Sequence, residues 1–263
     1  MSYRDYLTAA VAIAREAGEI QLEGLPKAKE LEFKGSKLNV VTQIDKACEK
    51  RICEFLREKF PSHDILAEEG GGRDTQSDWR WVVDPLDGTV NYSHGYPLFS
   101  VSIALQYKKE IVVGVVYEPN RDELFIAEKG GGAMLNDKPI RVSNTADTQL
   151  SLLSTGFAYN VVDTKRNNLD HFGNFILQAQ AVRRDGCAST NLCYIACGRF
   201  DGFWELFLKP WDIAAGALIL EEAGGQVTMF NGDPLTIYGD EIVASNGALH
   251  PTMLSILKQG RRK

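Results

Sequence analysis

The sequence predicts a layered α/β fold, built as a single domain over 1–263 with an α+β half at about 1–145 and an α/β half at about 146–263. Helical periodicities alternate with short apolar runs typical of strands, which favours helices packed on sheets. The 263 residues are 44% apolar and 24% charged, values of a globular protein that can bury a core. No internal repeat or low-complexity linker divides the chain.

Two helices and a run of strands are predicted in the first half. Apolar residues at helical spacing predict a helix over 3–25, and Pro26 stops it. A loop is expected over 32–37. A second helix follows Thr42, which is placed as its N-cap, and Asp45 can complete a capping box or have a functional role. Strands are predicted at 64–67, 81–83, 98–107, 111–118 and 123–128, and the glycines at 130–132 form a turn into 133–136.

Strands and helices alternate in the second half. Strands are predicted at 151–156, 181–184, 200–206, 226–230 and 241–245, and helices at 168–180, 191–197, 213–223 and 251–257. Asp212 comes directly before the apolar helix 213–223, where an aspartate is most often an N-cap. The same position also brings a carboxylate to the mouth of the sheet.

Composition and charge exclude several classes of function. The formal net charge of −6 argues against nucleic acid as the main ligand. No signal peptide and no long uncharged apolar run are present, so we expect a soluble, cytoplasmic protein without membrane contact. The five cysteines form no C-x-x-C and have no zinc spacing, which favours reduced core thiols.

An acidic turn follows the apolar run at 81–83. Asp84 and Asp87 enclose Pro85, and Gly88 and Thr89 come next. Two carboxylates this close repel unless a proton or a cation lies between them, and all-oxygen ligands favour Mg²⁺. The amides after Asp87 are able to bind a phosphate. The structural alternative is an Asp-Pro/Asp-Gly turn whose carboxylates are solvated.

Glu68 and Asp212 extend this acidic set. Glu68 follows the strand at 64–67, and its structural alternative is a solvated acidic turn. With Asp84 and Asp87 they make four carboxylates at strand ends or at a helix start, an arrangement that suits a multi-metal hydrolytic centre. Thr89 adds a hydroxyl that can hold a water molecule.

Other hydrolytic motifs are absent. A D-x-D-x-T phosphatase needs acids two positions apart, whereas Asp84 and Asp87 are three apart. The sequence has no G-x-S-x-G, P-loop or H-E-x-x-H, and its four histidines form no ligand pair. Metal-activated water is the chemistry that remains.

Several motifs resemble those of the inositol monophosphatase family. They are W-V-V-D-P-L-D-G-T-V-N at 81–91, K-P-W-D-I-A-A-G at 209–216, E-A-G-G at 222–225, V-T-Q-I-D at 41–45 and A-E-E-G at 67–70. The resemblance covers about residues 5 to 250. It implies an αβαβα sandwich of the inositol monophosphatase and sugar phosphatase type, a homodimer, and Mg²⁺-dependent hydrolysis of a phosphate monoester, with inositol monophosphate as the expected substrate.

The resemblance also implies a metal-ligand set. One Mg²⁺ is expected at Glu68, Asp84 and the Leu86 carbonyl, and a second at Asp84, Asp87 and Asp212. A weaker third ion is expected near Glu68, which makes about two to three ions per site.

Catalytic and substrate-binding roles come from the same resemblance. Glu68 and Thr89 are expected to orient and deprotonate the attacking water, with Asp45 hydrogen-bonded to Thr89. The second metal is expected to stabilise the leaving group. The predicted substrate-binding residues are Asp87, Gly88, Thr89, Gly186, Cys187, Ala188, Glu205 and Asp212, with the amides of Gly88 and Thr89 on the phosphate. Cys187 stands where many members have a small hydroxyl or alanine-like residue, and Lys34 falls where the family has a lysine near the metals.

Alternatives within and beyond catalysis stay open. Relatives hydrolyse fructose 1,6-bisphosphate, histidinol phosphate or 3′-phosphoadenosine phosphate, but the pattern at 186–191 with Glu205 resembles the inositol branch. Arg183 and Arg184 are the obvious basic pair for a second phosphate and could instead lie at a dimer interface. Some bacterial relatives act as partners in transcription antitermination. All expected metal ligands are present, which favours catalysis, and a partner role can coexist with it.

Overall fold

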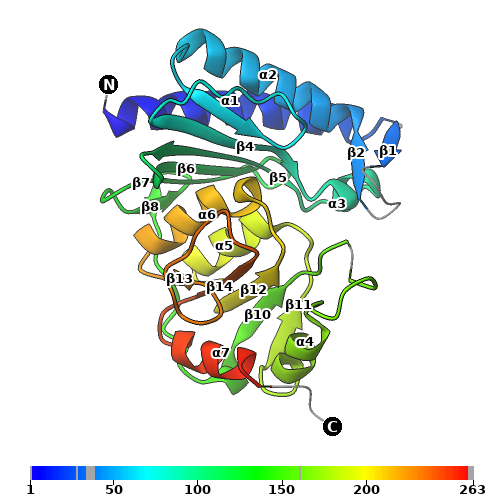
Figure 1. Ribbon diagram of the computed structural model, residues 1–263, viewed down its shortest axis with the longest axis vertical. Coiled ribbons are helices and arrows are strands. Elements are labelled where there is room, and N and C mark those ends of the chain that lie inside the picture. Colours follow the sequence, from blue (N-terminus) through cyan, green and yellow to red (C-terminus); the bar gives the residue numbers. More distant parts are fainter. Residues whose placement is uncertain (1, 28, 34–38, 160, 260–263) are drawn as a thin grey trace.

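Helices and sheets alternate in five layers, αβαβα (Figure 1). The computed structural model describes residues 2–27, 29–33, 39–159 and 161–259. The layering confirms the predicted α/β fold. Lys34 and the remainder of the predicted loop at 34–37 lie outside the described residues.

The first two layers are a helix pair and a seven-stranded sheet. Helices α1 (Tyr3–Gly24) and α2 (Gln43–Lys59) cover one face of the sheet (Figure 1). Its strands, in the order β3-β4-β5-β6-β7-β8-β9, are β3 (Asp64–Ala67), β4 (Trp79–Asp87), β5 (Ser100–Tyr107), β6 (Glu110–Glu118), β7 (Glu123–Glu128), β8 (Ala133–Leu135) and β9 (Lys138–Pro139). Alternate residues of β5, such as Val101 and Ile103, pack under the helices, whereas Ala104 faces the next layer.

The middle layer consists of two helices between the sheets. Helices α5 (Ala188–Ala196) and α6 (Pro210–Glu222) pack against each other and against both sheets. Residues 213–220 of α6 are buried on every side, as expected for an apolar helix between two sheets. This layer brings the N-terminal ends of both helices toward the ends of the strands.

The last two layers are a five-stranded sheet and its outer helices. The sheet has the order β11-β10-β12-β14-β13, with strands β10 (Leu152–Thr155), β11 (Ala181–Arg183), β12 (Gly202–Leu206), β13 (Gln226–Thr228) and β14 (Glu241–Ser245). Helices α4 (Leu169–Ile176) and α7 (His250–Leu257) cover its outer face (Figure 1).

Several predicted boundaries are wrong. Helix α4 ends at Ile176, well before 180, and α5 begins three residues earlier than predicted, after Cys187. Residues 31–33, predicted in part as loop, form β1 (Leu31–Phe33), which pairs with β2 (Val40–Thr42). The prediction missed β1 because all three of its side chains are exposed and give no apolar periodicity. It did not resolve two short helices, α3 (Thr89–Ser93) and η1 (Thr148–Leu150).

Two further features concern the described part of the chain. Within the described ranges no helix is long and apolar enough to cross a membrane. The cysteines at 48, 53, 187, 193 and 197 are free thiols, and only Cys197 is partly exposed.

Candidate active site

A cavity of about 420 Å³ opens where the ends of both sheets meet the middle helices. Five carboxylates line it: Glu68 after β3, Asp84 and Asp87 on β4, Glu205 on β12 and Asp212 on α6. Of the sequence-predicted site residues, Leu86, Gly88, Thr89, Gly186, Cys187 and Ala188 also line it. Asp45 is not part of the lining but contacts it through Thr89.

The Asp84 to Asp87 segment forms a bulge within β4. Asp84 pairs with Ser102 and Asp87 with Ser100, so three steps along β4 face two along β5. The prediction that this strand ends at 83 is therefore wrong, because pairing with β5 continues through the turn. Asp84 Oδ1 accepts a hydrogen bond from the Leu86 amide at 3.0 Å, which fixes the carboxylate toward the cavity side of the bulge.

Gly88 permits the sharp turn from β4 into α3. Its φ of +93° lies in the left-handed region, and a Cβ there would lie 3.0 Å from the Leu98 carbonyl oxygen. The turn places the Thr89 hydroxyl 2.9 Å from Asp45 Oδ1 and 3.1 Å from the Leu86 carbonyl. A hydroxyl has one proton, and the carboxylate is the stronger acceptor, so Thr89 donates to Asp45 and keeps its lone pairs for another donor.

Asp45 completes the predicted capping box and also contacts Thr89. Its Oδ2 accepts from the Thr42 amide at 2.9 Å and completes the predicted capping box of α2. Its Oδ1 accepts from Thr89. Burial raises the pKa of Asp45, and the hydrogen bonds from Thr42 and Thr89 oppose that rise.

Asp87 is bound to the N-terminus of α5. Its Oδ2 accepts from the Ser189 amide at 2.7 Å and from the Ser189 hydroxyl at 2.6 Å. Ser100 lies 2.8 Å from the Ser189 hydroxyl. The Cys187 thiol is buried beside Ser100, and burial raises its pKa well above the ordinary value, which keeps it protonated.

Asp212 lies inside α6 and is not its N-cap, contrary to the prediction. The helix begins at Pro210 after the cap residue Lys209, since proline is favoured in the first helical turn. Asp212 Oδ2 accepts from the Lys209 amide at 2.6 Å. The carboxylate still lies at the mouth of the sheet, as the sequence indicated.

Mutual repulsion and burial shape the electrostatics of the acidic cluster. Burial, and then the charges of Glu68, Asp87 and Asp212, raise the pKa of Asp84 well above its ordinary value. Burial and the charge of Asp87 raise the pKa of Asp212 in the same way. In the described part of the chain no three His, Cys, Asp or Glu side chains are placed to hold a metal ion as they stand. The carboxylates of Asp84, Asp87 and Asp212 instead accept hydrogen bonds from backbone amides.

The opposite wall contains residues that sequence reasoning did not assign. Gly156 follows β10, and a Cβ there would lie 2.2 Å from Glu205 Oε2, so a larger residue would displace this buried carboxyl from its position. Arg184, one of the basic pair with open roles, lines the cavity, and its charge opposes the burial that raises the pKa of Glu205. Tyr159 lines the cavity as well, and burial, followed by the charges of the acidic cluster, raises its pKa to about 12. Only the fold reveals Gly156, because its partner is 49 residues away.

A layered α/β fold with such an acid-lined cavity is that of a phosphatase, and the comparisons with known proteins agree. The chain belongs to the inositol monophosphatase family, whose model matches residues 2–262. This family is generally metal-dependent.

Individual relatives resemble the chain over nearly its whole length. An inositol-1-monophosphatase of Synechocystis sp. is 44% identical over 232 residues, which are 88% of this chain and 81% of the relative. A Nus factor SuhB of Pseudomonas aeruginosa is 40% identical over 259 residues, 96% of this chain and 95% of that one. The solved inositol monophosphatase of Anabaena (Nostoc) sp. superposes with a TM-score of 0.88 at 42% identity, covering 97% of this chain and 95% of that one.

Proposed function

We propose that the protein hydrolyses inositol monophosphate to inositol and phosphate with the help of Mg²⁺. The observation that supports this function most directly is that four carboxylates line one cavity: Glu68, Asp84, Asp87 and Asp212. The chain is also a member of this family. Similar enzymes named for inositol monophosphate support the choice of substrate.

The donor chemistry of the cavity fits divalent cations. Burial, and then the charges of the neighbouring acids, raise the pKa values of Asp84 and Asp212, as expected of a buried oxygen set that lacks a balancing positive charge. Glu68, Asp84 and the Leu86 carbonyl would hold one ion, and Asp84, Asp87 and Asp212 a second, with a weaker third near Glu68. Bound Mg²⁺ supplies positive charge that acidifies water and stabilises the phosphate oxygens.

The protein's own groups orient the attacking water, accept its proton and bind the phosphate. Thr89 donates to Asp45, so its oxygen accepts a hydrogen bond from the attacking water and orients it. Glu68 takes the water's proton. The amides of Gly88 and Thr89 donate to the phosphate oxygens, where the left-handed turn brings the backbone close to the cavity.

The other wall of the cavity binds the alcohol part of the substrate. Glu205 accepts a hydrogen bond from a substrate hydroxyl, and Asp212 faces the leaving oxygen. Gly186, Cys187 and Ala188 shape the floor, and the small residues at 186 and 188 give the ring space. The Cys187 thiol lies 3.5 Å from the Asp87 carbonyl and is directed into the protein, so it contributes volume rather than charge.

Phosphate release with and without Mg²⁺ tests the function. The panel contains inositol 1-phosphate, fructose 1,6-bisphosphate, histidinol phosphate and 3′-phosphoadenosine phosphate. Mg²⁺-dependent release that is fastest from inositol 1-phosphate is expected. Faster release from another ester would identify that ester as the better substrate, and no release from any ester would refute the enzymatic proposal.

The predicted homodimer is also a proposal. Helix α4 and its C-cap residue carry exposed apolar side chains at Leu169, Ile176 and Leu177, which are 54%, 43% and 67% exposed. A second copy covering this outer helix would remove them from water. Light scattering after gel filtration should give twice the monomer mass, and Leu177→Lys should reduce it.

Relatives named Nus factor SuhB favour a coexisting role as a protein partner in transcription antitermination. Co-elution with a purified antitermination complex tests it, and an inactive Asp84→Asn variant should co-elute equally. A cytoplasmic location stays a prediction, which the free thiols support.

A further inference from the structure

The loop that carries Glu68 is short and closed at its base. Ile65 on β3 and Arg73 exchange two backbone hydrogen bonds of 2.8 Å each. These bonds close the base of the loop formed by residues 66–72. Gly70 has a φ of +98°, and a Cβ built there would meet no packed neighbour within 4 Å. The base alone therefore does not fix the direction of Glu68.

A buried carboxylate on α2 binds the tip of this loop. Glu49 is 4% exposed, and its Oε2 accepts from the Glu69 amide at 2.6 Å while its Oε1 accepts from the Gly71 amide at 2.7 Å. Charge-assisted hydrogen bonds of this length are roughly twice as strong as neutral ones. Arg57, two turns further along α2, donates to the Gly71 carbonyl. A Cβ at residue 71 would lie 2.7 Å from Glu49 Oε1, so any larger residue there would displace the Glu49 carboxylate.

Glu49 is four residues after Asp45 on the same helix. Residues at this spacing share one face of a helix, one turn apart. Asp45 accepts the hydrogen bond of Thr89, and Glu49 binds the amide directly after Glu68. One rigid helical turn thus sets the distance between the two segments that carry Thr89 and Glu68.

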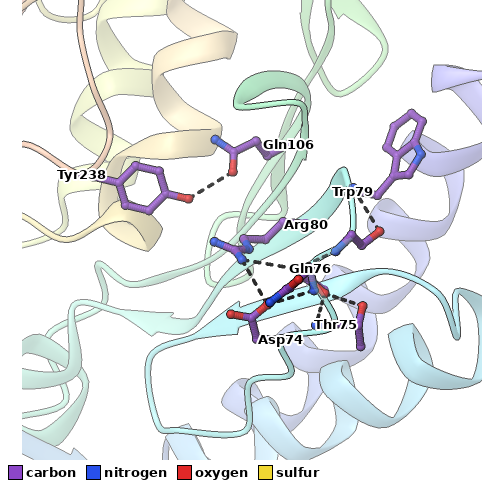
Figure 2. A network of polar contacts seen from close by, with 9 residues as sticks. Asp74, Thr75, Gln76, Trp79, Arg80, Gln106 and Tyr238 are labelled. Carbon is purple, nitrogen blue, oxygen red and sulfur yellow. Dashed lines mark hydrogen bonds and ion pairs between the residues drawn. The ribbon is translucent and has the colours of Figure 1, made fainter.

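The far end of the loop has a separate anchor. Asp64 Oδ1 accepts from the Thr75 amide and hydroxyl at 2.6 Å each, and Arg80 lies 3.3 Å from Asp64 Oδ2. Figure 2 shows Arg80 beside Asp74 and Thr75, with Tyr238 bonded to Gln106 nearby. This second anchor supports the loop without touching the residues next to Glu68.

We propose that Glu49 is a positioning residue for the hydrolytic reaction, which acts by holding the Glu68 loop in register with Thr89 through helix α2. The inference rests on the proposed function. Misplacement of a reacting group by about 1 Å can cost roughly a hundredfold in rate. Loss of Glu49 therefore affects turnover more than substrate binding, because the groups on the Glu205 wall stay in place.

The test compares Glu49→Ala and Glu49→Gln with two controls. Asp64→Asn weakens the other anchor of the same loop, and Glu54→Gln changes an exposed acid on the same helix. In the metal-free proteins, amide hydrogen exchange at Glu69 and Gly71 is measured by NMR. With Mg²⁺, kcat, KM and the half-saturating Mg²⁺ concentration are measured on the best ester.

Glu49→Ala should speed exchange at both amides at least about tenfold and lower kcat about tenfold to a hundredfold, with KM changed less than about threefold. The Mg²⁺ requirement should rise. The kcat and the amide exchange rates of Glu49→Gln should lie between those of Glu49→Ala and wild type, because the amide oxygen of glutamine still accepts one hydrogen bond. Both controls should keep wild-type kcat and exchange at these amides, although Asp64→Asn should lower the melting temperature.

An active wild type with unchanged kcat in both Glu49 variants would overturn the inference alone. Equal losses of kcat in Asp64→Asn and Glu49→Gln would also overturn the inference, because they would show that any weakening of the loop lowers turnover. An inactive wild type would overturn both the proposed function and this inference.

Discussion

The Thr89 hydroxyl lies 2.9 Å from Asp45 Oδ1, although the two residues are 44 positions apart in the sequence. Asp45 accepts this bond with one oxygen and caps helix α2 with the other. The orientation of the Thr89 oxygen toward the cavity thus depends on the end of a helix. A change that loosens this contact should act on catalysis, and a change that loosens only the cap should act on stability.

Thr89→Val should lower kcat by about 10²–10⁴-fold, because the variant keeps the shape of the side chain but cannot accept a hydrogen bond from the attacking water and orient it. Thr89→Ser should retain most of the activity, since serine supplies the same hydroxyl. Steady-state kinetics with saturating Mg²⁺ measures both variants.

Thr42→Ala is the matched control for this pair. It removes the N-cap side chain and should reduce the free energy of unfolding by about 0.5–2 kcal/mol. Its kcat should stay within about threefold of wild type. Similar kcat losses in Thr42→Ala and Thr89→Val would show that Thr89 acts through stability.

Asp84→Asn and Glu68→Gln should abolish turnover and leave the fold intact. Asp84→Asn should also raise the melting temperature of the metal-free protein, because it removes a buried charge that Glu68, Asp87 and Asp212 repel. Wild type should gain about 2.7 kcal/mol of stability at a Mg²⁺ concentration of 100 times Kd, and Asp84→Asn should lose most of this gain. Thermal unfolding with and without Mg²⁺ measures the difference.

The exposed acid Asp233 provides the control, and Asp233→Asn should show the full Mg²⁺-induced rise. Retained turnover in both Asp84→Asn and Glu68→Gln would contradict the proposed ligand set. An undiminished Mg²⁺ response in Asp84→Asn would place the ion elsewhere.

Local chemistry made part of the site predictable from the sequence. The Asp84 and Asp87 turn and the Thr42 and Asp45 capping box depend on residues within four positions of one another, so spacing alone indicates them. The layered fold follows from alternating periodicities in the same way. The ligand and catalytic roles, and the single-domain boundary at 1–263, stay predictions.

Contacts between distant segments could not be predicted. Strand β4 continues to Asp87 because β5 pairs with it, and Asp212 is inside its helix because Pro210 starts the helix earlier. Hydrophobic periodicity in the sequence does not show which strands pair, and it does not locate the start of a helix to within a residue or two. Glu49 and Gly156 lie against the Glu69 amide and the Glu205 carboxyl, which only the folded chain brings near.

Gly156→Ala should raise KM about tenfold and leave kcat and the Mg²⁺ requirement nearly unchanged. A Cβ at residue 156 would overlap the Glu205 carboxyl at 2.2 Å and force it away from the substrate hydroxyl. One lost hydrogen bond of about 1.4 kcal/mol corresponds to this tenfold change. Kinetics on inositol 1-phosphate measures it.

Gly173→Ala is the matched control, because a Cβ there meets nothing within 4 Å. This substitution inside α4 should leave KM unchanged and increase stability by up to about 1 kcal/mol. An unchanged KM in Gly156→Ala would show that Glu205 does not contact the substrate.

At saturating Mg²⁺, protonation of His250 should lower the stability of the protein as the pH drops below about 6.5. His250 is buried, with Nε2 2.9 Å from the Thr228 hydroxyl and Nδ1 2.9 Å from the Ser245 hydroxyl. Thr228 donates its proton to the Met229 carbonyl, so the hydrogen-bond network assigns the proton of the neutral imidazole to Nε2, with Nδ1 accepting from Ser245. A second ring proton would require the Ser245 hydroxyl to turn its own proton away from Nδ1 and would place a charge in this buried site.

Burial lowers the pKa of His250, so the unfolded chain takes up a proton at a higher pH than the folded protein does. The stability contributed by the neutral imidazole is complete above the unfolded pKa and is lost as the pH falls from there toward the lowered folded pKa. Each unit of lowering contributes about 1.4 kcal/mol. Urea unfolding between pH 5.5 and 7.5 at saturating Mg²⁺ should show a shallower slope for His250→Asn than for wild type. The exposed His94→Gln should reproduce the wild-type slope, and equal slopes in all three proteins would contradict the assignment to His250.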